Sequence, residues 1–389
     1  MRSECKDGVL TLYLEGRVDT TNAPQTEAEI EAARAGASYT AVVIDADGLE
    51  YISSAGLRVV LRLRKAEPSL RVINASSEVY EIFEMTGFSE MIPVEKAYRK
   101  LSVEGCKVIG QGAKGTVYRW NEDTIVKVYK NPDSLPDIQR ERDLARRAFV
   151  LGIPTAISYD VVRVGESFGS VFELLNAKPF SELIAADPEG RAPYVRTAAE
   201  MLRQIHSTEV RPEDMPDNKK LVQRWCADVA EHLPADQHAR LVALVDAVPD
   251  VMHMVHGDYH TNNIMMQGEE ALLIDMDTLS HGHPVFELAN VYVTYVAFGE
   301  ADPTVVEKFL GMPYDVAVKF WQEFLPAYLG TDDPARIAAV EQKAQLLGYV
   351  RLLRHTVRRG VETDAARRKV EIAKQKIADL LPQVDTLDF

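Results

Sequence analysis

The chain has 389 residues, more than a single hydrophobic core usually fills, so we expect two or three domains. Its 46% hydrophobic and 26% charged residues are typical of a globular protein. The formal net charge of −15 at pH 7 argues against non-specific nucleic-acid binding, because a phosphate backbone would be repelled. This charge would suit a cationic substrate. Our preferred interpretation is that it serves solubility alone.

The sequence also argues against a membrane or secreted protein. No apolar run approaches the length needed to cross a bilayer, and residues 1–8 lack the apolar segment of a secretory signal. The three cysteines, Cys5, Cys106 and Cys226, are too widely spaced to indicate a disulfide framework or a cysteine-rich zinc site. We therefore expect a cytoplasmic protein that binds neither membrane nor nucleic acid.

The first hundred residues alternate between strand-like and helix-like patterns. Strand-like runs occur at 9–18, 41–45 and 70–74, and helical patterns occur at 28–35, 56–65 and 78–85, the last stopped by Gly87. This alternation predicts a β/α domain.

Residues 49–60, Leu-Glu-Tyr-Ile-Ser-Ser-Ala-Gly-Leu-Arg-Val-Val, resemble the STAS domain of anti-sigma-factor antagonists. In that family a serine at the start of a helix is phosphorylated, and the phosphate meets the positive end of the helix dipole. Ser54 aligns with that serine, whereas Ser53 stands where the family often has aspartate and Ala55 where it has a second serine. The resemblance implies a STAS-like regulatory domain over 1–101, a protein partner bound through it, and Ser54 as a regulatory phosphosite. The alternative is that one of the two serines only caps the helix.

A second block begins near residue 103. Its expected strands are 117–120, 124–129, 158–164 and 169–175, with a charged helix at 137–151. Helical periodicity dominates from residue 180, for example at 193–206, and is interrupted by a β-rich patch at 255–277.

The pattern G-x-G-x-x-G-x-V is formed by Gly110, Gly112 and Gly115 with Val117. Glycines allow a backbone to approach phosphate oxygens closely. A Rossmann turn would need a helix directly afterwards, and a Walker A loop would need lysine where Thr116 stands. The pattern therefore predicts a glycine hairpin over a nucleotide, with a plain hairpin turn as the alternative.

Lys127 lies within an apolar strand-like run, where an unpaired ammonium would be costly to bury. The phosphates of ATP and a glutamate from the following helix would supply anionic partners, and Glu141 is our candidate for that ion pair. Asp137 and Asp143 lie on the same stretch and remain alternatives, as does an exposed Glu141 without this role.

Ser167 lies in a G-x-S-x-G pattern, which occurs in serine hydrolases. A nucleophile elbow leads from a strand into a helix, but residues 170–175 are strand-like. We expect Ser167 to lie at a hairpin between two strands rather than to act as a nucleophile.

The segment His256-Gly-Asp258 with Asn263, followed by Asp275, carries the most specific chemistry. A hydroxyl that attacks the γ-phosphate of ATP must be held in line and lose its proton, and Asp258 is our candidate catalytic carboxylate. Mg²⁺ prefers oxygen ligands, which Asn263 and Asp275 would supply.

Two other interpretations concern neighbouring residues. His253, His256 and His260 could form a zinc triad, but the spacing lacks a helical register, and His256 is better explained as a brace of the catalytic loop. Asp277 is either a second acid near the metal or a loop residue that hydrogen-bonds its own backbone, and we favour the loop residue.

The spacing of His256, Asp258, Asn263 and Asp275 resembles the signature of aminoglycoside phosphotransferases and choline kinases. The stretches 202–206 and 282–289 are also similar to that family, with Glu287 replacing the usual aspartate, a change that we expect to alter a structural hydrogen bond. Residues 171–175, which include Glu173, resemble the hinge whose backbone binds adenine.

The resemblance implies a bilobal protein-kinase-like fold, so that the whole is an α/β and α+β two-domain chain. The kinase-like domain would span 102–389, with a small lobe at 102–178 and a large helical lobe at 179–389. It implies ATP and Mg²⁺ as cofactors and transfer of the γ-phosphate to a hydroxyl of an aminoglycoside-like, sugar or amino-alcohol acceptor. The alternatives are a protein-serine kinase or a nucleotide-responsive regulator in a STAS-type partner switch.

Near the C-terminus, basic residues recur at helical spacing and predict one positive helix face. The residues are Arg351, Arg354, His355, Arg358 and Arg359. We favour a solvated face that pairs with acidic neighbours, and a patch for an anionic substrate or partner is the alternative.

Overall fold

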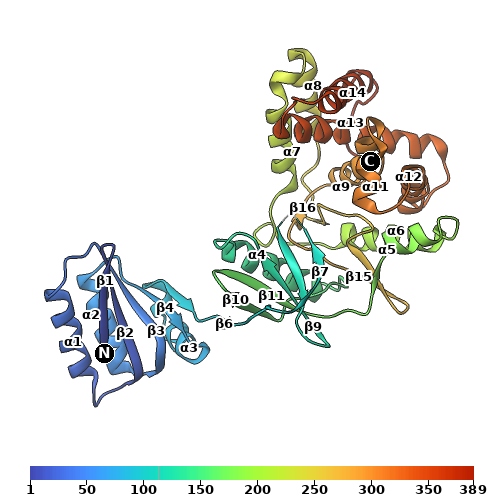
Figure 1. Ribbon diagram of the computed structural model, residues 1–389. Coiled ribbons are helices and arrows are strands. Elements are labelled where there is room, and N and C mark those ends of the chain that lie inside the picture. The colour runs from blue at the N-terminus through green and yellow to red at the C-terminus, as the bar shows by residue number, and fades with distance from the viewer. Residues whose placement is uncertain (113) are drawn as a thin grey trace. The chain divides into compact units, whose positions relative to one another are not determined.

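The computed structural model describes residues 1–112 and 114–389, and Figure 1 shows its elements. The chain divides into two units, the first made of Met1–Ser102 with Val161–Glu166 and the second of Val103–Asp160 with Ser167–Phe389. Each unit has its own hydrophobic core. Within the described residues, no helix combines the length and the apolar character that a bilayer crossing requires.

The first unit is built on a five-stranded sheet in the order β1-β2-β3-β4-β5. The strands are β1 Arg2–Lys6, β2 Val9–Val18, β3 Ala41–Ile52, β4 Arg71–Ala75 and β5 Val94–Lys96. Strand β1 is antiparallel to β2, and the other neighbours are parallel. The helices are α1 Ala23–Ala35, α2 Ser54–Ala66 and α3 Ser77–Met85, followed by the 3-10 turn Phe88–Glu90. The short strand β6 (Arg99–Lys100) pairs in parallel with β10 (Asp160–Val164).

The expected β/α alternation is therefore present, because apolar residues of the strands and helices share one core. Leu10, Leu12 and Ile44 of the sheet are buried together with Val60 of α2 and Phe83 of α3. The sequence does not predict β1, since all five of its residues are exposed and show no apolar alternation.

The second unit begins with an antiparallel run of strands in the order β11-β9-β8-β7. The strands are β7 Lys107–Gln111, β8 Gly115–Arg119, β9 Thr124–Tyr129 and β11 Ser167–Glu173, and the accompanying helix is α4 Leu135–Val150. Ser167 starts β11, and its hydroxyl donates to the Tyr129 carbonyl at 2.6 Å. A strand follows this serine where a hydrolase would have a helix, as expected.

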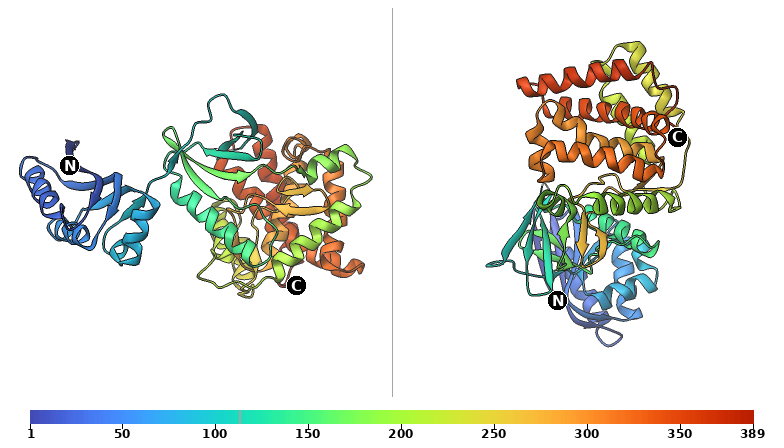
Figure 2. Two further views of the ribbon diagram at one scale, coloured as in Figure 1. Left: turned by 90° about the horizontal axis from the view of Figure 1, so that it is seen from below. Right: turned by 90° about the vertical axis from the view of Figure 1, so that its right-hand side faces the viewer.

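Helices dominate the remainder of the second unit. They are α5 Phe180–Ala186, α6 Ala192–Ser207, α7 Asn218–Asp228, α8 Ala235–Asp246, α9 Pro284–Tyr292, α10 Phe298–Glu300, α11 Pro303–Leu310, α12 Tyr314–Leu329, α13 Pro334–Arg359 and α14 Asp364–Leu380. Two further helical segments are the 3-10 turn Ala230–His232 and the π-helical Val293–Ala297. In the right-hand view of Figure 2 the C-terminal helices, orange to red, run side by side.

Short strands among these helices carry the loops of the candidate site. Strands β12 (Lys178–Pro179), β14 (Ile264–Gln267) and β15 (Glu270–Leu273) form one small sheet. Strands β13 (Met254–Val255) and β16 (Ser280–His281) form a second. The loop between β13 and β14 and the segment after β15 therefore contain the residues of the predicted catalytic motif.

Candidate active site

A cavity of about 450 Å³ lies within the second unit, lined by residues of the strand-rich part and of the helical part. Seven of the predicted site residues line it: Gly112, Gly115, Lys127, Glu141, Glu173, Asp258 and Asp275. Gly110, on β7, and Asn263, in the loop before β14, are not in this lining. The structure thus gathers most of the predicted residues around one space, although up to 163 positions separate them in the chain, from Gly112 to Asp275.

The glycine hairpin lies between β7 and β8. A Cβ added at Gly115 would collide with the Val128 carbonyl of β9, so this glycine is required by the close approach of two backbones. The Lys130 ammonium donates to the Gly112 carbonyl at 2.8 Å and ties the hairpin to the end of β9. Residue 113, inside the motif, lies outside the described residues.

Lys127 forms the ion pair expected for a buried lysine. Its Nζ lies 2.9 Å from Glu141 Oε1 on α4 and 3.6 Å from Asp275 Oδ1. Burial alone would lower the pKa of Lys127, but the charges of Glu141 and Asp275 outweigh it and raise that pKa. Glu141 is itself buried, whereas the alternatives Asp137 and Asp143 are exposed.

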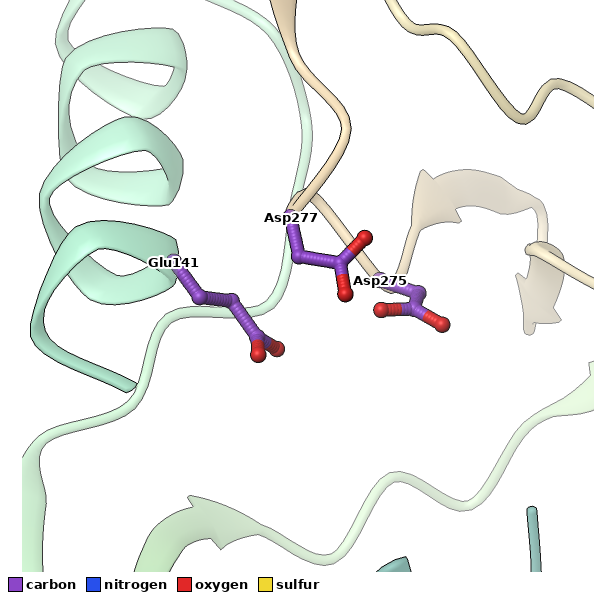
Figure 3. Close-up of side chains that lie close together, drawn as sticks. All are labelled: Glu141, Asp275 and Asp277. Carbon is purple, nitrogen blue, oxygen red and sulfur yellow. The ribbon is translucent and has the colours of Figure 1, made fainter. Parts of the chain in front are cut away.

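Asp275 and Asp277 lie close to Glu141, as Figure 3 shows. One carboxylate oxygen from each residue lies within 4.8 Å of the others, and a hard divalent cation takes this kind of donor. Asp275 holds a left-handed backbone conformation with φ 63°, a strained position of the kind found at functional sites.

Our preferred interpretation of Asp277 is wrong. Its carboxylate does not serve as a cap for its own backbone but pairs with the Lys114 ammonium from the glycine hairpin. The sequence does not reveal this contact, because 163 positions separate the two residues and only the fold brings them together.

The loop between β13 and β14 holds Asp258 at the cavity. Burial would raise the pKa of this carboxyl, but the hydrogen bond from His260 and the charges of His260 and Arg351 lower it to about 2. Asp258 is therefore ionised at neutral pH and can accept a hydrogen bond from a hydroxyl. The Asn263 amide donates to the Asp258 carbonyl at 3.0 Å, so this side chain fixes the loop.

Helix α9 supports the loop from behind. Gly257 has φ 86°, and a Cβ there would lie 2.6 Å from the Thr278 carbonyl, so only glycine fits. The Gly257 N–H donates to Glu287 Oε2 at 2.8 Å, and the Asn290 amide donates to the Gly257 carbonyl at 3.1 Å. Glu287 thus makes a structural hydrogen bond, as expected where it replaces the usual aspartate.

The zinc interpretation finds no support in the geometry. Across residues 1–112 and 114–389, the acidic trio of Glu141, Asp275 and Asp277 is the one group of metal-capable side chains that converges, and it includes no histidine. His256 instead braces the loop, because its ring nitrogen Nδ1 accepts from the Asp258 N–H at 3.3 Å and its carbonyl accepts from Thr278.

The basic face of α13 divides into two sets. Arg354 and Arg358 both pair with Asp228 of α7, at 2.6 and 3.8 Å, which agrees with the expected solvated face and acidic neighbours. Arg351 instead turns inward to the Trp225 ring, 5.6 Å from its centroid. Its helical spacing is visible in the sequence, but its direction depends on how α13 packs.

Family comparisons agree with both parts of the chain. Residues 105–317 match the Phosphotransferase enzyme family, and residues 1–101 match the STAS domain. A curated Bordetella bronchiseptica (strain RB50) protein assigned as the anti-sigma factor antagonist BtrV is 44% identical over 92 residues, which cover 23% of this chain and 78% of that protein.

Solved structures resemble the chain at low sequence identity. The aminoglycoside phosphotransferase APH(4)-Ia is 13% identical with a TM-score of 0.50, covering 71% of this chain and 93% of that one. ADP-bound APH(2'')-Ib is 15% identical with a TM-score of 0.48, covering 77% and 98%. At this identity the likeness concerns the fold alone, and the region after residue 102 has the protein-kinase-like fold.

Proposed function

Since the chain belongs to the Phosphotransferase enzyme family and carries an N-terminal STAS domain, we propose that it transfers the γ-phosphate of ATP to a hydroxyl of a small molecule in the presence of Mg²⁺. One observation carries the proposal: Lys127, Asp258 and Asp275 line the same cavity beneath the glycine hairpin. The cavity thus combines a lysine ammonium, an ionised carboxylate and an acidic residue with a strained backbone. This combination suits phosphoryl transfer.

The residues divide the work as follows. Lys127, held by Glu141, pairs with phosphate oxygens, and the backbone of the glycine hairpin at Gly112 and Gly115 covers them. The hinge end of β11 at Glu173 offers its backbone to the adenine ring. These contacts hold the nucleotide so that its terminal phosphate faces the catalytic loop.

The acidic residues suit Mg²⁺, which neutralises phosphate charge when it is bound. Asp275 is the proposed carboxylate ligand, and the neighbouring Asp277 adds a second one. Asn263 remains our proposed amide ligand, although its NH₂ group is engaged by the Asp258 carbonyl, so that its oxygen is the atom left to coordinate a cation.

Asp258 acts on the acceptor. Its ionised carboxylate accepts a hydrogen bond from the acceptor hydroxyl and directs the oxygen at the γ-phosphorus. The new P–O bond forms as the bond to the bridging oxygen of ADP breaks, and the hydroxyl proton passes to Asp258 and then to solvent.

Calorimetric titration with Mg-ATP tests the nucleotide site. We expect Lys127→Ala and Asp275→Ala each to weaken Mg-ATP binding at least about tenfold, since each removes a charge that faces the phosphates or the metal. Lys178→Ala is the matched control, because this exposed lysine of β12 pairs with Glu182 of α5 and does not line the cavity. Affinity as tight as that of the unmodified chain in both site variants would refute the assignment.

A second candidate function rests on Ser54. This serine is exposed at the first position of α2, so its hydroxyl is free to accept a phosphate, and the similarity to an anti-sigma factor antagonist supports a protein partner. The acceptor would then be a protein serine, its own Ser54 or that of another STAS domain. Intact-mass spectrometry after incubation with Mg-ATP, with Ser54→Ala as control, distinguishes this function: an added phosphate absent from the variant supports it.

We also propose a role for each domain and lobe of the chain. The STAS domain spans 1–101 and regulates a phosphotransferase domain at 102–389, whose small lobe at 102–178 holds the nucleotide and whose large lobe at 179–389 holds the acceptor.

A further inference from the structure

The tip of the glycine hairpin carries a lysine at the cavity. Lys114 lies between Gly112 and Gly115, and both Lys114 and Asp277 line the cavity of about 450 Å³. The Lys114 ammonium pairs with the Asp277 carboxylate. The lysine side chain is 61% exposed and the aspartate side chain only 10%, so the pair joins an exposed cation to a nearly buried anion.

Hydrogen bonds hold the backbone on both sides of this lysine. The Gly112 N–H donates to the Gly115 carbonyl at 2.9 Å across the hairpin. The Lys130 N–H donates to the Lys114 carbonyl at 2.9 Å, and Lys130 Nζ donates to the Gly112 carbonyl at 2.8 Å. Because the backbone is held in this way, the Lys114 ammonium can change partners by rotation of its own flexible side chain.

Two lysines share three carboxylates at the cavity. Lys127 pairs with Glu141 and Asp275, whereas in the part of the chain that the structure describes Asp277 has its ion pair with Lys114. One oxygen from each of the three acidic residues lies within 4.8 Å of the others (Figure 3), so a divalent cation at this place would meet Asp277 as well. The Lys114 ammonium and such a cation compete for the same carboxylate, because like charges repel at short range.

The residue after Asp277 packs against the loop that carries Asp258. The Thr278 hydroxyl donates to a carbonyl of that loop at 2.8 Å. A Cβ at Gly257 would lie 2.6 Å from the Thr278 carbonyl, so the two backbones approach closely. Asp258 and Asp277 are thereby held as neighbours at the cavity that Lys114 also lines. A terminal phosphate that faces Asp258 would therefore lie next to the carboxylate with which Lys114 pairs.

We propose that Lys114 is a ligand of the terminal phosphate of ATP, and that it leaves Asp277 when Asp277 binds Mg²⁺. The inference rests on the proposed phosphotransfer and adds a residue to its nucleotide site. The exchange keeps the charges matched, because Asp277 replaces an ammonium with a divalent cation while Lys114 replaces a carboxylate with a phosphate oxygen. An ion pair with one exposed partner stabilises a fold little, so the exchange costs little.

Calorimetric titration of the full chain with Mg-ADP and Mg-AMP-PNP tests the phosphate contact without requiring turnover. AMP-PNP keeps the terminal phosphate that ADP lacks. Lys114→Met should weaken Mg-AMP-PNP binding at least about tenfold and Mg-ADP binding less than about threefold, because only Mg-AMP-PNP offers the phosphate that Lys114 meets. Lys114→Arg, which keeps the charge, should retain part of the affinity that Lys114→Met loses. Equal losses for the two nucleotides, or no loss for either, overturn the proposal.

Lys107→Met is the matched control for the hairpin. This lysine is exposed on β7 of the same hairpin and does not line the cavity. The variant removes the same charge as Lys114→Met and should leave the affinity for both nucleotides unchanged. A selective loss of Mg-AMP-PNP affinity in Lys107→Met as well would attribute the effect to the overall charge of the hairpin and overturn the assignment to Lys114.

Titration with Mn²⁺ in the absence of nucleotide tests the exchange at Asp277. Mn²⁺ takes oxygen ligands as Mg²⁺ does, and the free ion is measured by electron paramagnetic resonance. Lys114→Met should bind Mn²⁺ at least about threefold more tightly than the unmodified chain, because the competing ammonium is gone. This change is opposite in sign to the loss of Mg-AMP-PNP affinity. Mn²⁺ binding that is unchanged or weaker in the variant, or undetectable in both proteins, overturns the exchange.

Lys127→Ala, titrated with the same nucleotides, separates this inference from the function beneath it. If Lys127→Ala loses affinity for both nucleotides while Lys114→Met loses affinity for neither, the role of Lys114 is refuted and the nucleotide site stands. If Lys114→Met shows the selective loss but the unmodified chain releases no ADP from Mg-ATP with any alcohol, phosphotransfer is refuted and the contact between Lys114 and the terminal phosphate stands.

Discussion

Glu287 places a carboxyl group in a fully buried position behind the loop that carries Asp258. Burial raises its pKa to about 7, although the Gly257 N–H hydrogen bond favours the ionised form. The buried groups facing it include His206, whose Nε2 lies 4.0 Å away, His256 and Arg351. The protonation of the loop support therefore changes near neutral pH.

This titration predicts a pH-dependent stability difference between the chain and its Glu287→Gln variant. The pKa of Glu287 is raised from its ordinary value of 4.5 to about 7 in the folded chain, so the unfolded chain releases the proton at lower pH. The contribution of Glu287 to the free energy of unfolding is therefore fully present below pH 4.5 and is lost as the pH rises through 7. From about pH 5 to about pH 8 the unmodified chain should lose about 2 kcal/mol relative to the glutamine variant, which cannot ionise.

Urea unfolding of both proteins at the two pH values measures this difference. His206 and His256 have lowered pKa values and titrate in the opposite sense, but they are present in both proteins, so their contribution cancels in the comparison. A difference between the two proteins that does not change with pH would show that Glu287 does not titrate near 7.

At the residue scale, the sequence predicts best the contacts that a motif spacing encodes. Lys127, Asp258 and Asp275 could be found because each stands at a fixed offset in a chemical pattern, and Glu141 because it lies on the next helix. The ion pair between Lys114 and Asp277 could not be predicted from the sequence, and neither could the inward direction of the Arg351 side chain. Both depend on packing between segments that lie far apart in the chain.

The start of helix α2 gives two neighbouring serines different structural roles. The Ser53 hydroxyl accepts from the Ala55 N–H at 3.1 Å and caps the helix, which leaves the adjacent Ser54 exposed. Gly56, in the first turn, packs so closely that a Cβ would lie 2.6 Å from Ile52 and 2.9 Å from Val18. The start of α2 is therefore fixed both by its cap and by its packing on the sheet.

The cap predicts different costs for the two serines. Ser53→Ala should lower the free energy of unfolding of the first unit by about 1 kcal/mol, because it leaves helix N–H groups without an acceptor, whereas Ser54→Ala should change it by less than about 0.5 kcal/mol. Denaturant unfolding followed by circular dichroism compares the two variants. A larger loss for Ser54→Ala than for Ser53→Ala would contradict the assignment of the cap.

Element types could be predicted where apolar periodicity is strong, as along β2, α6 and α4. Element ends were less predictable: β3 continues to Ile52, seven residues beyond the expected run, because pairing with β2 extends it past the apolar stretch. The exposed edge strand β1 owes its conformation to hydrogen bonding with β2 and has no pattern of its own.

At the scale of the whole molecule, two separate cores agree with the expectation of more than one domain from chain length. The sequence could not predict that Val161–Glu166 groups with the first unit, since that depends on the pairing of β10 with β6, about 60 residues earlier in the chain. The overall charge does not show how charges are distributed, since basic residues recur along α13 in a chain whose net charge is −15.

The central claim is that Asp258 directs an acceptor hydroxyl at ATP held by Lys127 and Asp275. The most direct test is ADP release from Mg-ATP over a panel of neutral, cationic and anionic alcohols, with the unmodified chain beside Asp258→Ala. We expect at least one alcohol to accelerate ADP release, and the variant to lose at least about 100-fold of that rate while its Mg-ATP affinity is retained. Equal rates for the two proteins would contradict the account.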